Sequence, residues 1–204
     1  MTGLMINKIL NYFDELIPNP KCELKYCSDF EFLIAVVLSA QTTDNKVNSV
    51  TKELFKYDIN SLKIEEINNI IKPIGMSLKK SYYVKSIAKY VSKYGIPKSK
   101  DELLKLDGVG NKTANLVLST LYNEPYFAVD THVSRVSKRL GLVSEDASIL
   151  EIEKKMYELI PKNLLNRSHH QFVLFGRYYC TSRNPKCKDC KLKNICKYYN
   201  KCLK

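Results

Sequence analysis

Five of the seven cysteines lie close together near the C-terminus, in a pattern that suits metal ligation. Cys180, Cys187, Cys190 and Cys196 are spaced C-x6-C-x2-C-x5-C, and Cys202 follows. An odd number of cysteines in a chain without a recognisable signal peptide does not predict a disulfide framework. Zinc ribbons usually have two short C-x2–4-C pairs, whereas this segment has one, so four thiolates from one compact loop favour an iron–sulfur cluster. Zinc and free thiols are the alternatives. We expect Cys196 rather than Cys202 to be the fourth ligand, because chain termini fray.

A second pattern with chemical meaning is Gly108-Val109-Gly110, followed by Lys112. Two helices joined by such a turn leave backbone N–H groups free at the start of the second helix. That position favours an anion, and the glycines allow a phosphate group to approach closely. A plain turn between two helices is the alternative, but the adjacent lysine and the basic charge of the chain favour phosphate binding.

The elements that must position these residues are predicted to be helices. The chain has only seven glycines and seven prolines, and no strand-like alternation of useful length. Apolar residues instead recur at helical spacing, and we expect helices over residues 4–17, 29–40, 44–55, 61–71, 79–94, 101–106, 111–121 and 131–140, with two or three more between 147 and 179. Residues 126–129 are predicted to be extended, and Asp130 is placed to cap the helix that follows.

Charge and hydropathy narrow the class of protein. The net charge is +12, and the last 28 residues contain nine basic residues and one acid, which is typical of a protein that binds a polyanion. Apolar residues make up 45% of the chain, so disorder is excluded. The longest apolar run, Phe32–Leu38, is far shorter than the ~20 residues that cross a bilayer. We therefore expect a soluble, intracellular protein that makes no membrane contact.

Three sequence segments together resemble the endonuclease III family of DNA glycosylases, which belongs to the helix-hairpin-helix superfamily. They are LDGVGNKTAN, VDTHVSR and the four spaced cysteines, and the upstream segments FLIAVVLSAQTTD and IKPIGM are similar as well. The resemblance covers nearly the whole chain. It implies an all-α, two-domain fold, with a helical barrel at residues 22–124 that contains the hairpin. Residues 1–21 and 125–204 would form a second helical domain with a 4Fe-4S cluster held by Cys180, Cys187, Cys190 and Cys196.

The resemblance also implies a catalytic pair, Lys112 and Asp130. In the family, the lysine attacks the sugar of a damaged nucleotide and forms a Schiff base, and the aspartate assists it. The expected activity is therefore that of a bifunctional DNA glycosylase and abasic-site lyase, which removes oxidised pyrimidines from double-stranded DNA and nicks the strand by β-elimination. The chain is expected to act as a monomer. The alternatives are that Lys112 is a solvated or phosphate-binding lysine and Asp130 an ordinary helix cap.

Further residues are implied to contact DNA. The hairpin of the family is matched by Gly108, Val109, Gly110 and Thr113. The residues that fill the gap left by an extruded nucleotide are matched by Gln41 and Met76. A basic loop is matched by Arg183, Lys186 and Lys188, and a position beside the lesion pocket by His132. Each of these has a plainer alternative as an ordinary loop, surface or structural residue. One departure is Asp107, which stands where the family commonly has proline; we expect its carboxylate to repel a nearby phosphate.

Two other functions stay open on the sequence. An adenine–DNA glycosylase shares the hairpin, the aspartate and the cysteine pattern, but it normally lacks a lysine at the position of Lys112 and has an additional C-terminal domain. A non-catalytic DNA-binding module would use the hairpin and the metal loop without any chemistry.

Overall fold

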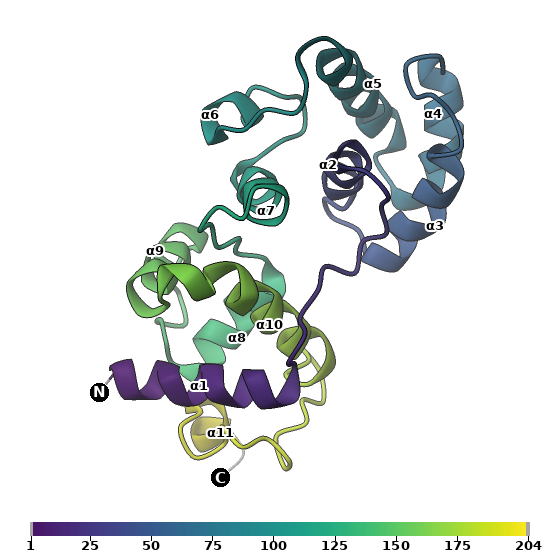
Figure 1. Cartoon of the computed structure of the whole chain (residues 1–204). Helices are drawn as coiled ribbons and strands as arrows, with labels where there is room; N and C mark the ends of the chain where they lie inside the picture. The colour runs from purple at the N-terminus through teal and green to yellow at the C-terminus, as the bar shows by residue number, and fades with distance from the viewer. Residues whose placement is uncertain (1, 203–204) are drawn as a thin grey trace. The chain divides into compact units, whose positions relative to one another are not determined.

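Helices make up the regular secondary structure of the computed structural model, which describes residues 2–202 (Figure 1). No strand is present in that part of the chain, so the all-α prediction is confirmed. The chain divides into two compact units: one runs from Glu23 to Asn123, and the other combines the chain up to Cys22 with the chain from Glu124 onward. No described helix has the length and apolar character needed to cross a membrane.

The unit Glu23–Asn123 is built around one apolar helix, α2. Its elements are α2 (Asp29–Leu38), α3 (Asp44–Leu54), α4 (Ile64–Ile71), the 3-10 turn η1 (Lys72–Ile74), α5 (Ser77–Tyr94), α6 (Lys100–Leu103) and α7 (Asn111–Leu121). All seven residues of the run Phe32–Leu38 are buried, because α3, α5 and α7 pack around α2 (Figure 1). The longest apolar run of the sequence is therefore the centre of a core.

Helix starts in this unit follow from capping side chains and turn geometry. Ser28 is the N-cap of α2: its hydroxyl accepts a hydrogen bond from the Glu31 N–H at 3.2 Å, and Asp29 lies in the first turn. That arrangement satisfies one of the donors that a helix start leaves open. The predicted helix at 79–94 begins two residues earlier, at Ser77, because Met76 adopts a left-handed conformation and serves as its N-cap.

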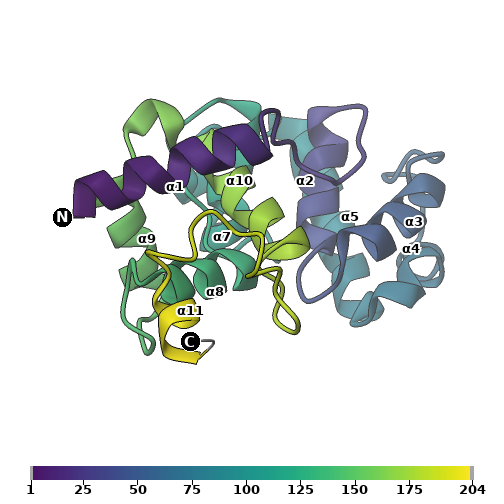
Figure 2. The ribbon, with the colours of Figure 1, turned by 90° about the horizontal axis from the view of Figure 1, so that it is seen from below.

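The other unit combines the N-terminal helix with the C-terminal third of the chain. Its elements are α1 (Thr2–Leu16), α8 (Thr131–Leu140), α9 (Ile149–Leu159), the 3-10 turn η2 (Lys162–Leu164), α10 (Leu165–Tyr178) and α11 (Lys197–Cys202). Helix α1 packs against α9 and α10, and α11 packs against α8 (Figures 1 and 2). The short helix α11 was not expected from the sequence.

Aromatic packing and one polar group attach α1 to the rest of its unit. The rings of Phe13 and Phe172 meet edge to face at a centroid distance of 5.1 Å. At the edge of this core, the carboxylate of Asp14 accepts hydrogen bonds at 2.8 Å from both Arg167 and Gln171 of α10. Burial of the large aromatic side chains supplies most of the stabilisation, and the polar contacts fix the position of α1 along α10.

Candidate functional site

The hairpin between α6 and α7 requires glycine at position 108 for two separate reasons. Gly108 has φ +77°, and a Cβ built there would lie 2.4 Å from the ring of Tyr83 on α5. The preceding residue, Asp107, accepts a hydrogen bond at 2.7 Å from the hydroxyl of Ser86, also on α5. One carboxylate oxygen is thus engaged, and Asp107 serves to attach the hairpin to α5, a structural role that the sequence did not reveal.

The first turn of α7 offers backbone donors and the amine of Lys112. The N-cap is Gly110, which has no side chain to accept from the N–H groups of that turn. Lys112 is the second residue of the helix; its side chain is exposed and has no hydrogen-bond or ion-pair partner within residues 2–202. Val109 and Thr113 are buried, so a phosphate would reach their backbone more readily than their side chains. The start of α7 is therefore suited to an anion, with a free amine beside it.

Asp130 caps α8, as the sequence predicted. Its Oδ1 accepts a hydrogen bond from the Val133 N–H at 2.8 Å, and the side chain is half-buried. Its Oδ2 accepts no hydrogen bond within the described residues. The cap therefore holds the carboxylate in one orientation and leaves an oxygen for a further partner. Lys112 and Asp130 belong to different units of the chain.

His132, two residues into α8, is held as a neutral ring. Its Nδ1 lies 3.1 Å from the guanidinium of Arg135, which can only donate, so Nδ1 accepts and Nε2 carries the proton. Burial lowers the pKa of His132; the charge of Asp130 opposes this shift, and the charge of Arg135 adds to it. The Cβ of His132 packs close to Gly176 of α10, where an added Cβ would lie 2.9 Å from it. A structural role is thus established, and substrate contact stays a prediction.

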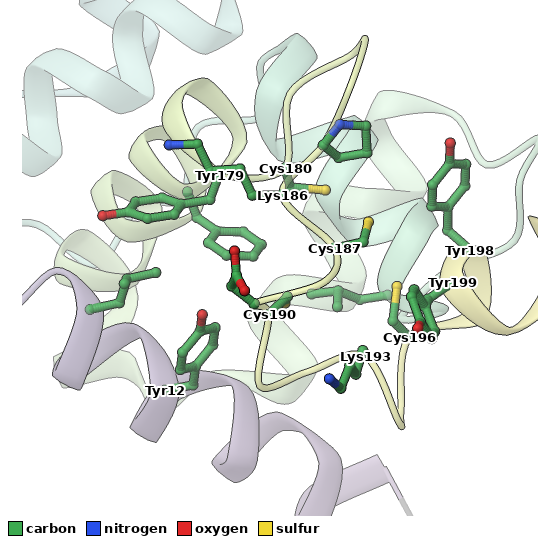
Figure 3. Close-up of a pocket in the computed structure, with 15 residues that line it drawn as sticks. Tyr12, Tyr179, Cys180, Lys186, Cys187, Cys190, Lys193, Cys196, Tyr198 and Tyr199 are labelled. Atoms are coloured by element: carbon green, nitrogen blue, oxygen red, sulfur yellow. The ribbon is translucent and has the colours of Figure 1, made fainter. Parts of the chain in front are cut away.

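The four spaced cysteines line one cavity of about 260 Å³. Figure 3 shows Cys180, Cys187, Cys190 and Cys196 around this cavity, together with Tyr12 of α1 and Tyr179 at the end of α10. All four are free thiols in the structure. Burial is the main cause of the raised pKa of Cys187, Cys190 and Cys196, and the neighbouring cysteines add to it. If these groups ionise to thiolates, they need a cationic centre to compensate their charge.

The arrangement of the thiols bears on which metal group fits them. Within residues 2–202, no three side chains of the His, Cys, Asp and Glu types are arranged to hold a single metal ion. The four cysteines line part of one cavity, together with aromatic, aliphatic and basic side chains. Four thiols on one loop form a donor set that is compatible with the all-thiolate ligation of a multinuclear cluster. The side chain of Cys202 lies outside the described residues.

Two arginines of α8 hold the start of the cysteine loop; Arg135 ends the segment VDTHVSR, and Arg139 lies outside the segments that the sequence analysis singled out. Arg139 donates to the carbonyls of Thr181 at 2.6 Å and Ser182 at 3.0 Å, and its Nη1 lies 3.4 Å from the Cys180 Sγ. Arg135 donates through Nε to the Cys180 carbonyl at 3.1 Å. Their i, i+4 spacing places them on one face of α8. The helix that begins at Asp130 thus also fixes the first ligand of the cysteine site.

The basic loop between the first two ligands, with Lys188 just beyond the second, is exposed. Arg183, Lys186 and Lys188 are all exposed, and the ammonium of Lys186 lies over the ring of Tyr179 at 5.2 Å from its centre. The loop is shaped by a bond from the Lys186 N–H to the Tyr179 carbonyl at 3.0 Å. A fixed loop that presents three exposed cations is suited to contacts with phosphates.

Gln41 and Met76 both lie in tight turns with strained backbones. Gln41 has φ +56° and Met76 has φ +51°, values that residues other than glycine seldom adopt. Both side chains are exposed, and Met76 keeps 51% of its surface accessible. An exposed methionine on a strained turn adds little to the core, so both residues are available to a partner.

Comparisons with known proteins agree with this picture. A family model described as HhH-GPD superfamily base excision DNA repair protein matches residues 34–162. The chain is 42% identical over 196 residues to endonuclease III of Bacillus subtilis (strain 168), covering 92% of this chain and 90% of that protein.

Solved structures of protein–DNA complexes are similar as well. The structure of a trapped endonuclease III–DNA covalent intermediate matches with a TM-score of 0.94 and 41% identity, over 100% of both chains. A non-covalent endonuclease III–DNA complex matches with a TM-score of 0.94 and 43% identity, over 100% of this chain and 99% of the other.

Proposed function

The chain belongs to the endonuclease III family of HhH-GPD base excision DNA repair proteins, and we propose that Lys112 and Asp130 carry out its chemistry. Its activity is that of a DNA glycosylase with abasic-site lyase activity, and its substrate is damaged double-stranded DNA. The observation that carries the residue assignment is the exposed amine of Lys112, which has no partner within residues 2–202 and lies beside an uncapped helix start.

The proposed reaction begins with the Lys112 amine. The neutral amine attacks C1′ of the damaged nucleotide, the glycosidic bond breaks, and the base leaves with the bonding electrons and a proton. The sugar ring then opens to give an imine between C1′ and the Lys112 nitrogen. Loss of a proton from C2′ expels the 3′ phosphate, which nicks the strand, and water releases the enzyme.

Asp130 is proposed to act on charge and protons at the same centre. Its Oδ1 is held by the α8 cap, which leaves Oδ2 to accept a proton from the amine or to stabilise the cationic sugar. Fixing the carboxylate by its own helix avoids the entropic cost of ordering it during the reaction.

DNA binding is proposed to use three surfaces. The hairpin Gly108–Gly110 and the start of α7 would bind a backbone phosphate, and the loop with Arg183, Lys186 and Lys188 would bind others. Because the sugar of a stacked nucleotide is inaccessible, the damaged nucleotide must leave the helix. Gln41 and Met76 would occupy the space that it leaves, and the neutral His132 would contact the lesion through Nε2.

We further propose that Cys180, Cys187, Cys190 and Cys196 hold a 4Fe-4S cluster. The support is the cavity that the four thiols line, their spacing along one loop, and the family. The cluster, when bound, supplies a cross-link that holds the basic loop in place. Purified protein should be brown and contain about four irons per chain. Colourless protein with one zinc per chain would overturn this assignment.

Oxidised pyrimidines are the proposed lesions, on the basis of the family resemblance. A duplex with a single thymine glycol tests this. We expect base release and a nick 3′ to the lesion, and no cleavage of the undamaged duplex. If thymine glycol is left intact while an abasic site is cleaved, the lesion assignment is wrong and the lyase assignment stands.

The two alternatives from the sequence lose support. The Bacillus subtilis relative and the matching DNA complexes are endonuclease III, and Lys112 stands where an adenine–DNA glycosylase normally lacks a lysine. A non-catalytic module is set aside because the chain is an enzyme of this family.

A further inference from the structure

Lys80 is a buried lysine that the proposed reaction does not use. Only 3% of its surface is exposed, and burial lowers its pKa. It lies on α5, which runs beside α2 in the unit Glu23–Asn123 (Figure 1). Its Nζ donates to the Leu38 carbonyl at 3.0 Å and to the Ala40 carbonyl at 2.8 Å. Burying an ammonium costs free energy unless hydrogen-bond acceptors replace the water around it. The two carbonyls supply that replacement, and the ammonium in turn holds the chain segment that carries them.

The carbonyls that Lys80 binds are those that the end of α2 leaves open. The last carbonyls of a helix have no partner within the helix. At this end, the Val37 carbonyl accepts from the Ala40 N–H at 3.4 Å, and the Ser39 carbonyl accepts from the Thr42 N–H at 3.2 Å. Lys80 provides the donors for the carbonyls of Leu38 and Ala40. Its bond to the Ala40 carbonyl fixes the peptide that leads directly into Gln41.

The backbone of Lys80 also contacts the second strained turn, which contains Met76. The Lys80 N–H donates to the Met76 carbonyl at 2.9 Å, in the first turn of α5. The side chain of Lys80 therefore holds the turn with Gln41, and its backbone belongs to the turn that presents Met76. Both turns have positive φ, a conformation that persists only where the surroundings enforce it.

We infer that Lys80 is a positioning residue that sets Gln41 and Met76 at a fixed separation, so that both enter the DNA together when the damaged nucleotide leaves the helix. This inference rests on the gap-filling role proposed for these two side chains. A lysine suits the task because one ammonium carries three N–H donors, so it can donate to two carbonyls at the end of a helix at the same time.

The test compares two abasic substrates of the lyase reaction. Cleavage in a duplex requires the strand to be opened and the gap filled, whereas cleavage in single-stranded DNA requires neither. We expect Lys80→Met to lower kcat/KM on the duplex by about tenfold or more and to change that on the single strand by less than about twofold. The fluorescence of a 2-aminopurine placed opposite the abasic site should rise less when Lys80→Met binds than when the wild type binds. This signal reports the opening of the duplex at the gap. Lys80→Gln, which keeps a donor, serves if Lys80→Met does not fold.

Lys85 offers a matched control on the same helix. Its Nζ donates to the carbonyls of Asn60 at 2.7 Å and Ile59 at 3.3 Å, so it also holds a loop, but one remote in sequence from both turns. Lys85→Met should lower stability and leave the ratio of duplex to single-strand cleavage unchanged. An equal fall in this ratio for both lysine variants would overturn the inference.

The variants Gln41→Ala and Met76→Ala test the gap-filling role separately from the positioning role of Lys80. If both lower the ratio and Lys80→Met does not, the inference fails and the gap-filling assignment stands. If neither lowers it, the gap-filling role fails and the inference fails with it.

Discussion

At the scale of single residues, Asp130 combines a structural and a chemical role in one carboxylate. The cap uses Oδ1, and the proposed chemistry uses Oδ2. Asparagine retains the capping oxygen and removes the charge, whereas alanine removes both. The two substitutions therefore distinguish roles that a single variant would merge.

We predict that Asp130→Asn keeps the free energy of unfolding within about 0.5 kcal/mol of the wild type, since Asn and Asp cap helices equally well. Asp130→Ala should lower it by about 1 kcal/mol. Both should reduce single-turnover base release by about 100-fold or more, as expected for the removal of a group that handles protons in the transition state. Urea denaturation and quench-flow measurements check this. Unchanged base release in Asp130→Asn would show that the charge is not used.

At the scale of elements, α5 is the helix on which several candidate DNA contacts depend. Tyr83 meets Gly108, Ser86 binds Asp107, and Lys80 holds the end of α2. These residues recur at helical spacing, so α5 supports the hairpin and both strained turns. The helix can supply this support because it packs against α2 and α4, which fixes its own position.

The two glycines of the hairpin, Gly108 and Gly110, are predicted to differ in how much each contributes to stability. Gly108→Ala should lower the free energy of unfolding by more than about 2 kcal/mol, because the left-handed backbone alone costs about 1–2 kcal/mol and the Cβ displaces Tyr83. Gly110→Ala is the control: it has φ −101° and nothing within 4 Å of an added Cβ, so we expect a decrease of about 1 kcal/mol or less. Equal decreases in urea denaturation would contradict the packing argument.

The sequence predicted the elements better than the contacts between them. Helix positions followed from apolar spacing, and the Asp130 cap followed from its place before α8. Lys80 was overlooked although it lies four residues before Val84, in register with the buried face of α5; a charged residue in a core position was the available signal. The hold of Arg139 on the cysteine loop could not be predicted, because it depends on where distant segments pack.

At the scale of the whole molecule, the charge of +12 should appear as a steep dependence of DNA affinity on salt. We predict that replacing Arg183, Lys186 and Lys188 with glutamine lowers the slope of log K against log salt by about 0.9 for each phosphate that the loop no longer neutralises. Lys191→Gln is the control, because Lys191 is already paired with Glu15. Fluorescence anisotropy at several salt concentrations measures both slopes. If the triple variant has the same slope as the wild type, this loop is not part of the DNA interface.

The family and the all-α fold could also be predicted from the sequence at this scale, because three motifs occur together in one chain. The catalytic assignment depends instead on chemistry at Lys112, which lies in one compact unit while Asp130 lies in the other. A measurement on the reacting nitrogen itself is therefore the direct test.

That measurement is covalent trapping with borohydride, followed by peptide mapping. The protein is incubated with a duplex that contains one abasic site, and the reduced adduct is digested and located by mass spectrometry. We predict a single adduct on Lys112, and none in Lys112→Gln even though that variant still binds the duplex. An adduct on another lysine, or undiminished trapping in Lys112→Gln, would contradict the assignment of Lys112 as the nucleophile.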